Sequence, residues 1–391
     1  MTVVDRISNL SLSVFELSDE IEQACHSTQG RKLVRAAVVD RCEKQPDFRQ
    51  DLVDLGLAGN IIPDIEWEEI PRLVGRNRDM KLALKNQTRE LSIAIHDWLQ
   101  GTVREARIML RAASSLCKAC AENKSVFINN QSASLITQRL LGDDDNRQLL
   151  ELLATLVSDD DKFSKIPCHV FARDQLLEQE NLEALRRVLR KYADNSPHMS
   201  PKTILTLVRE LSVSQTTAKI FAMDEGYLKY ATRLVIDCKD ISLRATAAKY
   251  LRQASFCDEM KHLVWDTLLE CDSLVIWIYL SFEDEGMCVN LFATLANLTL
   301  KEPIVAMNLV QKHPVLIDLT QNVLSRGASS AVNSCMHFLR NLAKTTEGRK
   351  ILNDSLLSYL NAIQVTGTDT VRTISDEITH RLSRSESSAE S

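Results

Sequence analysis

A helical segment recurs along this chain at intervals of about 40 to 55 residues. Two copies, LFATLANLT at 291–299 and SCMHFLRNLA at 334–343, contain the same Asn-Leu pair near their ends. Taking the leucine of this pair as an anchor and reading backwards places equivalent leucines at Leu116, Leu156, Leu211, Leu251, Leu298 and Leu342. These intervals lie mostly in the range of stacked helical repeats. Because one such repeat cannot bury its own apolar face, the repeats must stack, and the chain is predicted to form an α-solenoid.

The composition also favours helices. Glycine and proline, the two residues that most often interrupt helices, contribute 11 and 8 of the 391 residues, which is under half of their roughly 12% average share. We therefore predict an all-α fold. A solenoid grows by adding repeats, so we expect one continuous stack rather than separate globular domains.

The charge of the chain disfavours a general nucleic-acid binder. The formal net charge is −6 and the pI is about 5.8, whereas binding to phosphates requires a basic face that displaces counterions. The longest apolar run, residues 273–282, is about half of the roughly 20 residues that cross a bilayer. We therefore expect no membrane span and read this run as a buried helix.

Cysteine usage predicts a reducing compartment. Ten cysteines are scattered without the spacing of a disulfide framework, and the first residues lack the apolar core of a signal peptide. We expect the protein in the cytoplasm, with the nucleus as a second expected location.

The clearest repeat, residues 286–328, contains three helical segments. They are expected at 288–300, 303–311 and 314–327, where Pro303 and Pro314 suit the first turn of a helix and Gly327 suits a helix end. The next repeat follows the same plan, with helices at 331–344, 347–352 and 356–363.

Earlier repeats are less regular, and we expect their long helices at 103–121, 147–157, 202–213 and 243–254. Residues 1–102 are predicted to form degenerate repeats that cap the stack, with helices near 14–24, 32–41 and 86–99. Residues 103–382 form the repeats proper and end in a capping helix at 370–382. Residues 383–391 have almost nothing apolar to bury, which predicts disorder.

Three helices per repeat, the first of them short, resemble the armadillo repeat. The resemblance implies a right-handed superhelix whose long third helices line a concave groove. In armadillo proteins an asparagine just before the anchor leucine commonly hydrogen-bonds the backbone of an extended peptide. Asn297 and Asn341 match this position. Carried over by register, the resemblance implies these groove residues: Arg111, Ser115, Glu210, Tyr250, Asn297, His337 and Asn341.

The chain departs from the best-known groove patterns. Only two of the six anchor leucines follow an asparagine, and no repeat has the tryptophan one turn earlier that an importin-alpha-like adaptor would show. The long basic row with which beta-catenin-like proteins hold acidic ligands is also missing. In an alternative interpretation, Asn297 and Asn341 only tie adjacent loops or helices together.

Two other clusters are open to two interpretations each. Cys117 and Cys120 have the spacing of half a zinc or redox site, with Cys168 and His169 as further ligands, but two thiols on one helix face also suit a packed repeat. The acidic runs 143–145 and 159–161 lack the glycine and the distal glutamate of a calcium loop. We interpret them as acids at helix starts, where the helix dipole favours negative charge.

The function predicted from the sequence is non-catalytic. No phosphate loop, nucleophile elbow, zinc-protease motif or dinucleotide fingerprint is present, and no cofactor is expected. We predict a scaffold or adaptor that binds an extended or helical segment of a protein partner in the groove; the sequence predicts no oligomeric state. The first alternative is a regulator of a folded partner such as a small GTPase or a chaperone. The second is an enzyme or metal protein.

Overall fold

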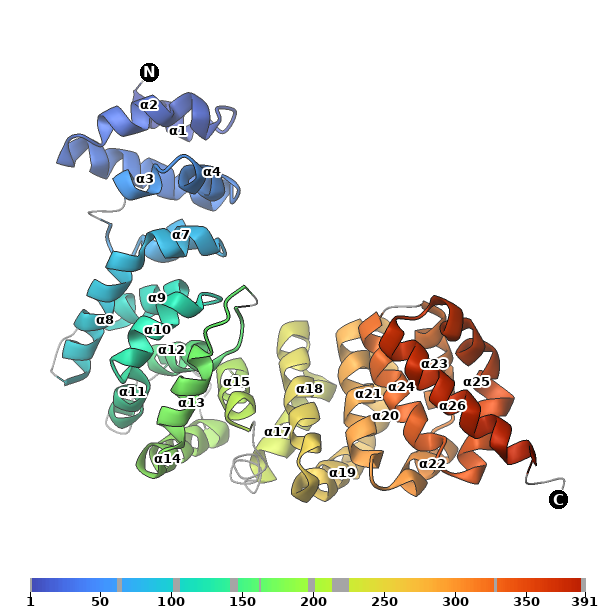
Figure 1. Cartoon of the computed structure of the whole chain (residues 1–391). Helices are drawn as coiled ribbons and strands as arrows, with labels where there is room; N and C mark the ends of the chain where they lie inside the picture. Colours follow the sequence, from blue (N-terminus) through green and yellow to red (C-terminus); the bar gives the residue numbers. More distant parts are fainter. Residues whose placement is uncertain are drawn as a thin grey trace. The chain divides into compact units, whose positions relative to one another are not determined.

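The computed structural model describes residues 2–61, 65–100, 106–140, 147–161, 163–195, 201–212, 225–326 and 329–387. These residues form helices and their connections, with no strand among them (Figure 1). The predicted all-α solenoid is thereby confirmed. Contacts within the chain define two compact units, Met1–Leu207 and Val208–Ser391, and the boundary between them crosses helix α15.

The first unit is built from helices of unequal length that pack in three rows. Its helices are α1 (Val3–Ser8), α2 (Val14–Ala24), α3 (Thr28–Lys44), α4 (Phe48–Asp54), α5 (Ala58–Ile61), α6 (Ile70–Val74), α7 (Arg78–Ala83), α8 (Lys85–Gln100), α9 (Ala106–Cys117), α10 (Ala121–Asn129), α11 (Ser132–Leu140), α12 (Arg147–Val157), α13 (Cys168–Leu177), α14 (Gln179–Asn195) and the start of α15 (Pro201–Leu211). Helices three apart in order pack side by side: α3, α6, α9 and α12 make one row, α8, α11 and α14 a second, and α7, α10 and α13 a third.

The second unit contains two such rows of helices. Its helices are α17 (Glu225–Asp237), α18 (Ile241–Phe256), the 3-10 turn η2 (Asp258–Met260), α19 (Lys261–Leu269), the 3-10 turn η3 (Glu270–Asp272), α20 (Ser273–Glu283), α21 (Glu285–Thr299), α22 (Pro303–Lys312), α23 (Val315–Arg326), α24 (Ser329–Leu342), α25 (Thr346–Thr366) and α26 (Asp369–Ser387). Helices α18, α21, α24 and α26 form one row, and α17, α20, α23 and α25 form the row packed against it, in the yellow to red part of Figure 1.

The anchor leucines lie in the interior of these rows. Leu116, Leu156, Leu211, Leu251 and Leu342 are fully buried, and Leu298 is nearly so. The long helices that carry them begin and end within a few residues of the predicted bounds, and α12 matches its predicted bounds. Burial of the anchors therefore explains the period seen in the sequence, since each repeat must place one leucine against its neighbours.

Helix starts follow from local chemistry. Pro303 lies in the first turn of α22, where its missing N–H leaves no partner unsatisfied. The carboxylate of Asp240 accepts hydrogen bonds from the backbone N–H groups of Ser242 and Leu243 at the start of α18. Asp284 caps α21 in the same way, through the N–H of Met287.

One tight turn occurs in both units. The sequences STQGRK at 27–32 and TTEGRK at 345–350 each place a hydroxyl cap before a helix and a glycine three residues later. A Cβ on Gly30 would lie 2.0 Å from the carbonyl oxygen of Ala24, and one on Gly348 would lie 2.1 Å from that of Leu342. Glycine is required at both positions because the new helix starts against the backbone of the preceding one.

Two predicted features differ from the structure, and others lie outside the described residues. Helices expected at 347–352 and 356–363 form the single helix α25, because nothing between them is a glycine or proline that would interrupt it. Helix α26 continues five residues past the predicted end at 382, since extending a formed helix gains one hydrogen bond per added residue. The predicted boundary at 102/103, the acidic run 143–145 and residues 388–391 of the predicted tail lie outside the described residues.

Candidate functional site

A cavity of about 380 Å³ lies on the row of long helices in the second unit. Helices α18, α21 and α24 contribute its lining, which we call the Asn297 cavity: Arg252, Gln253, Phe256, Ala293, Ala296, Asn297, Asn333, Ser334 and His337. The small side chains of Ala293 and Ala296 on the middle helix leave the space between the two outer helices open. Two residues predicted from the sequence, Asn297 and His337, thus line the same cavity.

Asn297 has a partly exposed side chain that also contacts the preceding long helix. Its amide nitrogen donates to Ser255 Oγ at 3.1 Å and approaches the carbonyl oxygen of Arg252 at 3.4 Å. Both acceptors belong to the last turn of α18, where the Ser255 hydroxyl also donates to the Arg252 carbonyl at 2.7 Å. Asn297 therefore joins α21 to α18 while part of its side chain remains accessible from the cavity.

His337 and Asn333 supply polar atoms on the α24 side of the cavity. Burial lowers the pKa of His337 below its ordinary value, the nearby Arg340 charge lowers it further, and Glu377 opposes the shift. His337 is therefore neutral at pH 7, with one ring nitrogen able to donate and the other able to accept. The buried Oδ1 of Asn333 has no hydrogen-bond partner among the described residues. Such an unpaired buried acceptor is costly unless a further donor reaches it.

Asn341 lies between helices rather than in the cavity. Its side chain is 1% exposed, and its amide nitrogen donates to the carbonyl oxygen of Ala296 at 2.9 Å and to Thr299 Oγ1 at 3.2 Å, both on α21. Lys344 Nζ donates to its Oδ1 at 3.1 Å. This geometry corresponds to the alternative interpretation, in which the asparagine ties neighbouring repeats together.

Replacing Asn341 by alanine is therefore expected to reduce stability. The change leaves the Ala296 carbonyl without its donor in the interior, which costs about 1 to 3 kcal/mol of unfolding free energy. Urea unfolding followed by circular dichroism measures this loss, and Asn297→Ala, with its weaker and more exposed contacts, is the matched control with a loss below about 1 kcal/mol. A variant Asn341→Ala that melts like wild type but loses a protein partner would instead assign this side chain to binding.

The other predicted groove residues do not lie at the Asn297 cavity. Tyr250 is fully buried on α18, so the structure places it in the core. Glu210 is nearly buried on α15 and forms an ion pair with Arg209. Arg111 and Ser115 lie on α9 in the first unit, where the Ser115 hydroxyl donates to the Arg111 carbonyl at 3.0 Å. The register of the repeat places these residues on the long helices, but it does not determine which face each one occupies.

Sequence reasoning missed the residues that make the Asn297 cavity distinctive. Phe256, at the end of α18, has 68% of its surface exposed, and it lies one turn after Arg252 on the same side of the helix. Asn333 precedes His337 by one turn of α24. The i, i+4 spacing of each pair in the sequence could have predicted that its two residues share one face of a helix.

The cysteines of the proposed half-site are packed in the interior. Cys117 and Cys120 are both fully buried, and burial raises the pKa of each thiol above its ordinary value. A raised pKa lowers the fraction of thiolate, which is the form that binds metals and reacts. Within the described ranges, no group of three or more histidine, cysteine, aspartate or glutamate side chains is arranged to hold a metal ion.

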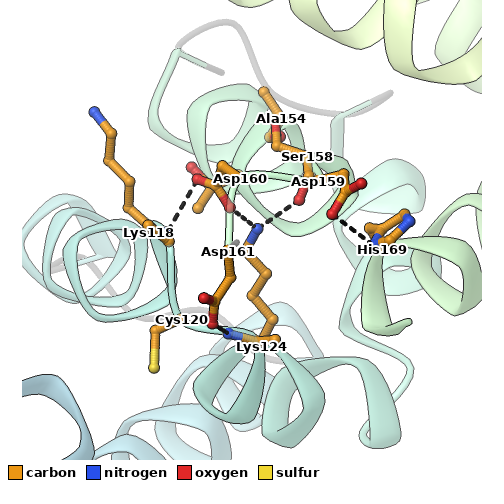
Figure 2. A network of polar contacts seen from close by, with 12 residues as sticks. Lys118, Cys120, Lys124, Ala154, Ser158, Asp159, Asp160, Asp161 and His169 are labelled. Carbon is orange, nitrogen blue, oxygen red and sulfur yellow. Dashed lines mark hydrogen bonds and ion pairs between the residues drawn. The ribbon is translucent and has the colours of Figure 1, made fainter. Parts of the chain in front are cut away.

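A polar network unites the α9–α10 turn with the acidic run that follows α12 (Figure 2). Asp161 accepts from the backbone N–H of Ala121, the first residue of α10, at 2.9 Å and from Arg78 Nε at 3.3 Å. The buried Lys124 side chain of α10 donates to the Ser158 carbonyl at 2.6 Å and forms an ion pair with Asp160. These acids do lie at a helix start, as predicted, but the helix belongs to the preceding part of the chain.

The charge of Asp161 is stabilised by this network. Burial alone would raise the pKa of its carboxyl, but the N–H groups of Ala121 and Phe163 and the Arg78 guanidinium lower it below its ordinary value. Asp161 is therefore ionised at neutral pH and holds the α10 N-terminus, Arg78 and its own segment together.

The comparisons with known proteins agree with this architecture. No protein-family model and no curated protein matches the chain. An engineered protein from the Northeast Structural Genomics Consortium is similar with a TM-score of 0.61 and 14% identity, over 98% of this chain and 99% of its own. A chain from a structure concerning the phosphorylation switch of the cadherin and beta-catenin interaction has a TM-score of 0.50 and 12% identity, over 97% and 87%. A designed armadillo repeat protein in complex with a peptide has a TM-score of 0.49 and 13% identity, over 64% and 99%.

At these identities the similarity concerns the fold. The chain has an armadillo-like all-α repeat fold. In the described part of the chain, every helix is too short or too polar to cross a membrane.

Proposed function

We propose that this protein is a non-catalytic scaffold or adaptor that binds a segment of a protein partner at the Asn297 cavity. The proposal rests on the combination of an exposed aromatic ring, that of Phe256, with the polar side chains of Arg252 and His337 in one open cavity. Aromatic side chains beside a depression are common anchors in protein interfaces, because they bury a large apolar area on binding.

The polar lining suits a peptide backbone. Neutral His337, whose side chain is partly exposed, can donate a hydrogen bond to a peptide backbone or accept one from it. Arg252 supplies an exposed cation at the rim. A segment that lies across α18, α21 and α24 would therefore gain hydrogen bonds for its main chain and an apolar contact with Phe256.

A pair of matched variants tests the proposal. Phe256→Ala with His337→Ala removes the aromatic anchor and one polar group, whereas Ile304→Ala removes a side chain of α22 that is 63% exposed and lies outside the cavity. Immobilised wild type and variants are compared for proteins captured from an extract of the native cells, by quantitative mass spectrometry. We expect at least about tenfold less of the principal partner on the cavity variant, and no change on the control.

The alternative, a regulator of a folded partner, is distinguished in the same experiment. Overlapping peptides of the captured partner are tested for binding, since a scaffold of the proposed kind binds a short segment. Binding that requires the intact partner domain would favour the regulator. Equal capture by the cavity variant and wild type would contradict the Asn297 cavity as the binding surface.

A further inference from the structure

A second cavity, of about 570 Å³, lies within the first unit. It opens between the segment 65–68, the last turns of α8 and the start of α9, and we call it the Trp67 cavity. Its volume is in the range of sites that bind small ligands or single side chains with their neighbours. It shares no residue with the Asn297 cavity.

The charged side chains that line the Trp67 cavity are all acidic. Among the described residues they are Glu66, Glu68 and Asp97. Glu66 lies 3.7 Å from Arg35, a guanidinium already paired with Glu69 at 2.7 Å. Neither Glu68 nor Asp97 forms an ion pair with another described residue, and both are exposed. Among the described residues nothing neutralises these two carboxylates, so they can pair with a cation that comes from outside the chain.

Two tryptophans line the cavity together with these carboxylates. Trp67 is half-buried between Glu66 and Glu68, and Trp98 follows Asp97 on α8. The face of a tryptophan ring attracts ammonium and guanidinium groups. The chain already uses this attraction once here, because the Arg139 guanidinium lies 5.5 Å from the centre of the Trp98 ring.

The remaining walls are apolar. Ile65, Ile108 and Met109 line the cavity, and Ala94, one turn before Asp97 and Trp98 on α8, leaves room for an entering group. A small inorganic or polyamine cation would leave these walls in contact with water, whereas a peptide would cover them. The site therefore suits a basic side chain whose neighbours are apolar.

We infer that the Trp67 cavity binds a lysine or arginine side chain of a partner protein, flanked by apolar residues. The ring of Trp67 and the carboxylates of Glu68 and Asp97 hold the cation, and the apolar walls hold its neighbours. This binding is independent of the proposed function at the Asn297 cavity, so either site can fail its test without affecting the other.

Fluorine NMR of the full-length protein labelled with fluorotryptophan tests the inference. The chain contains four tryptophans, two in each unit, and Trp67→Phe and Trp98→Phe assign the signals of interest. The probes are the capped tripeptides Leu-Lys-Leu and Leu-norleucine-Leu, which differ only in the cation, and spermine. We expect the lysine peptide to shift the Trp67 signal saturably while Trp265 and Trp277 stay unchanged, and the norleucine peptide to have no saturable effect.

Charge-neutral variants provide the control. Glu68→Gln with Asp97→Asn should weaken binding of the lysine peptide by at least about tenfold. Asp19→Asn with Glu22→Gln removes the same two charges from exposed positions on α2 and should leave binding unchanged. The inference is overturned if the norleucine peptide binds equally well, if only spermine binds, if nothing shifts at millimolar concentration, or if both double variants behave alike.

Discussion

Replacing Phe338 by alanine should lower the free energy of unfolding of the second unit by about 3 to 5 kcal/mol. The ring of Phe338 is fully buried on α24 and lies against Phe292 of α21, with 6.1 Å between ring centres and 46° between ring planes. Truncation leaves a cavity between these two long helices. The helices cannot approach each other to fill it without disrupting their other contacts. Urea unfolding followed by circular dichroism measures the effect.

Phe256→Ala is the matched control for this change. It removes the same ring from the same row of helices, but that ring is largely exposed, so the expected stability change is within about 0.5 kcal/mol. Comparing the two variants therefore distinguishes a loss of packing from a loss of binding. Equal melting of the Phe338 variant and wild type would mean that α21 and α24 do not pack as described.

Replacing Asp161 by asparagine should cost about 2 to 4 kcal/mol at pH 7. The carboxylate, whose side chain is 4% exposed, accepts hydrogen bonds from the N–H groups of Ala121 and Phe163 and from Arg78. Asparagine keeps the shape but has one acceptor oxygen and no charge for these three donors. The measurement is urea unfolding at neutral pH.

The pH dependence of this loss has a defined sign. Because the folded state lowers the pKa of Asp161, its charge contributes stability above the unfolded pKa of about 3.9, and this contribution disappears as the pH falls further. The gap between wild type and Asp161→Asn should therefore close below about pH 4. Asp159→Asn, two residues earlier and 67% exposed, is the control and should change stability little at either pH. A gap that persists unchanged at low pH would contradict the proposed role of the charge.

The sequence predicted the long helices well because their signals are local. The anchor leucines, Pro303 and the low glycine content act within one repeat, so a single chain carries the information. The expectation of stacked helices also followed, since each apolar face requires a neighbour.

Contacts between repeats were not predictable in the same way. Asn297 and Asn341 occupy the same register position, and both donate to the last turn of the preceding long helix, yet one lines a cavity and the other is buried. Asp161 stabilises the start of α10, about 40 residues earlier in the chain. No local sequence pattern indicates this pairing, because the two segments come into contact only in the folded protein.

Site-specific photo-crosslinking tests the central claim most directly. A benzoylphenylalanine placed at position 256 lies at the rim of the Asn297 cavity, and one placed at position 304 lies on α22 outside it. We expect the partner to crosslink from position 256, through a short segment identified by mass spectrometry, and not from position 304. Crosslinks from position 304 alone, or equal crosslinks from both positions, would contradict binding at the Asn297 cavity.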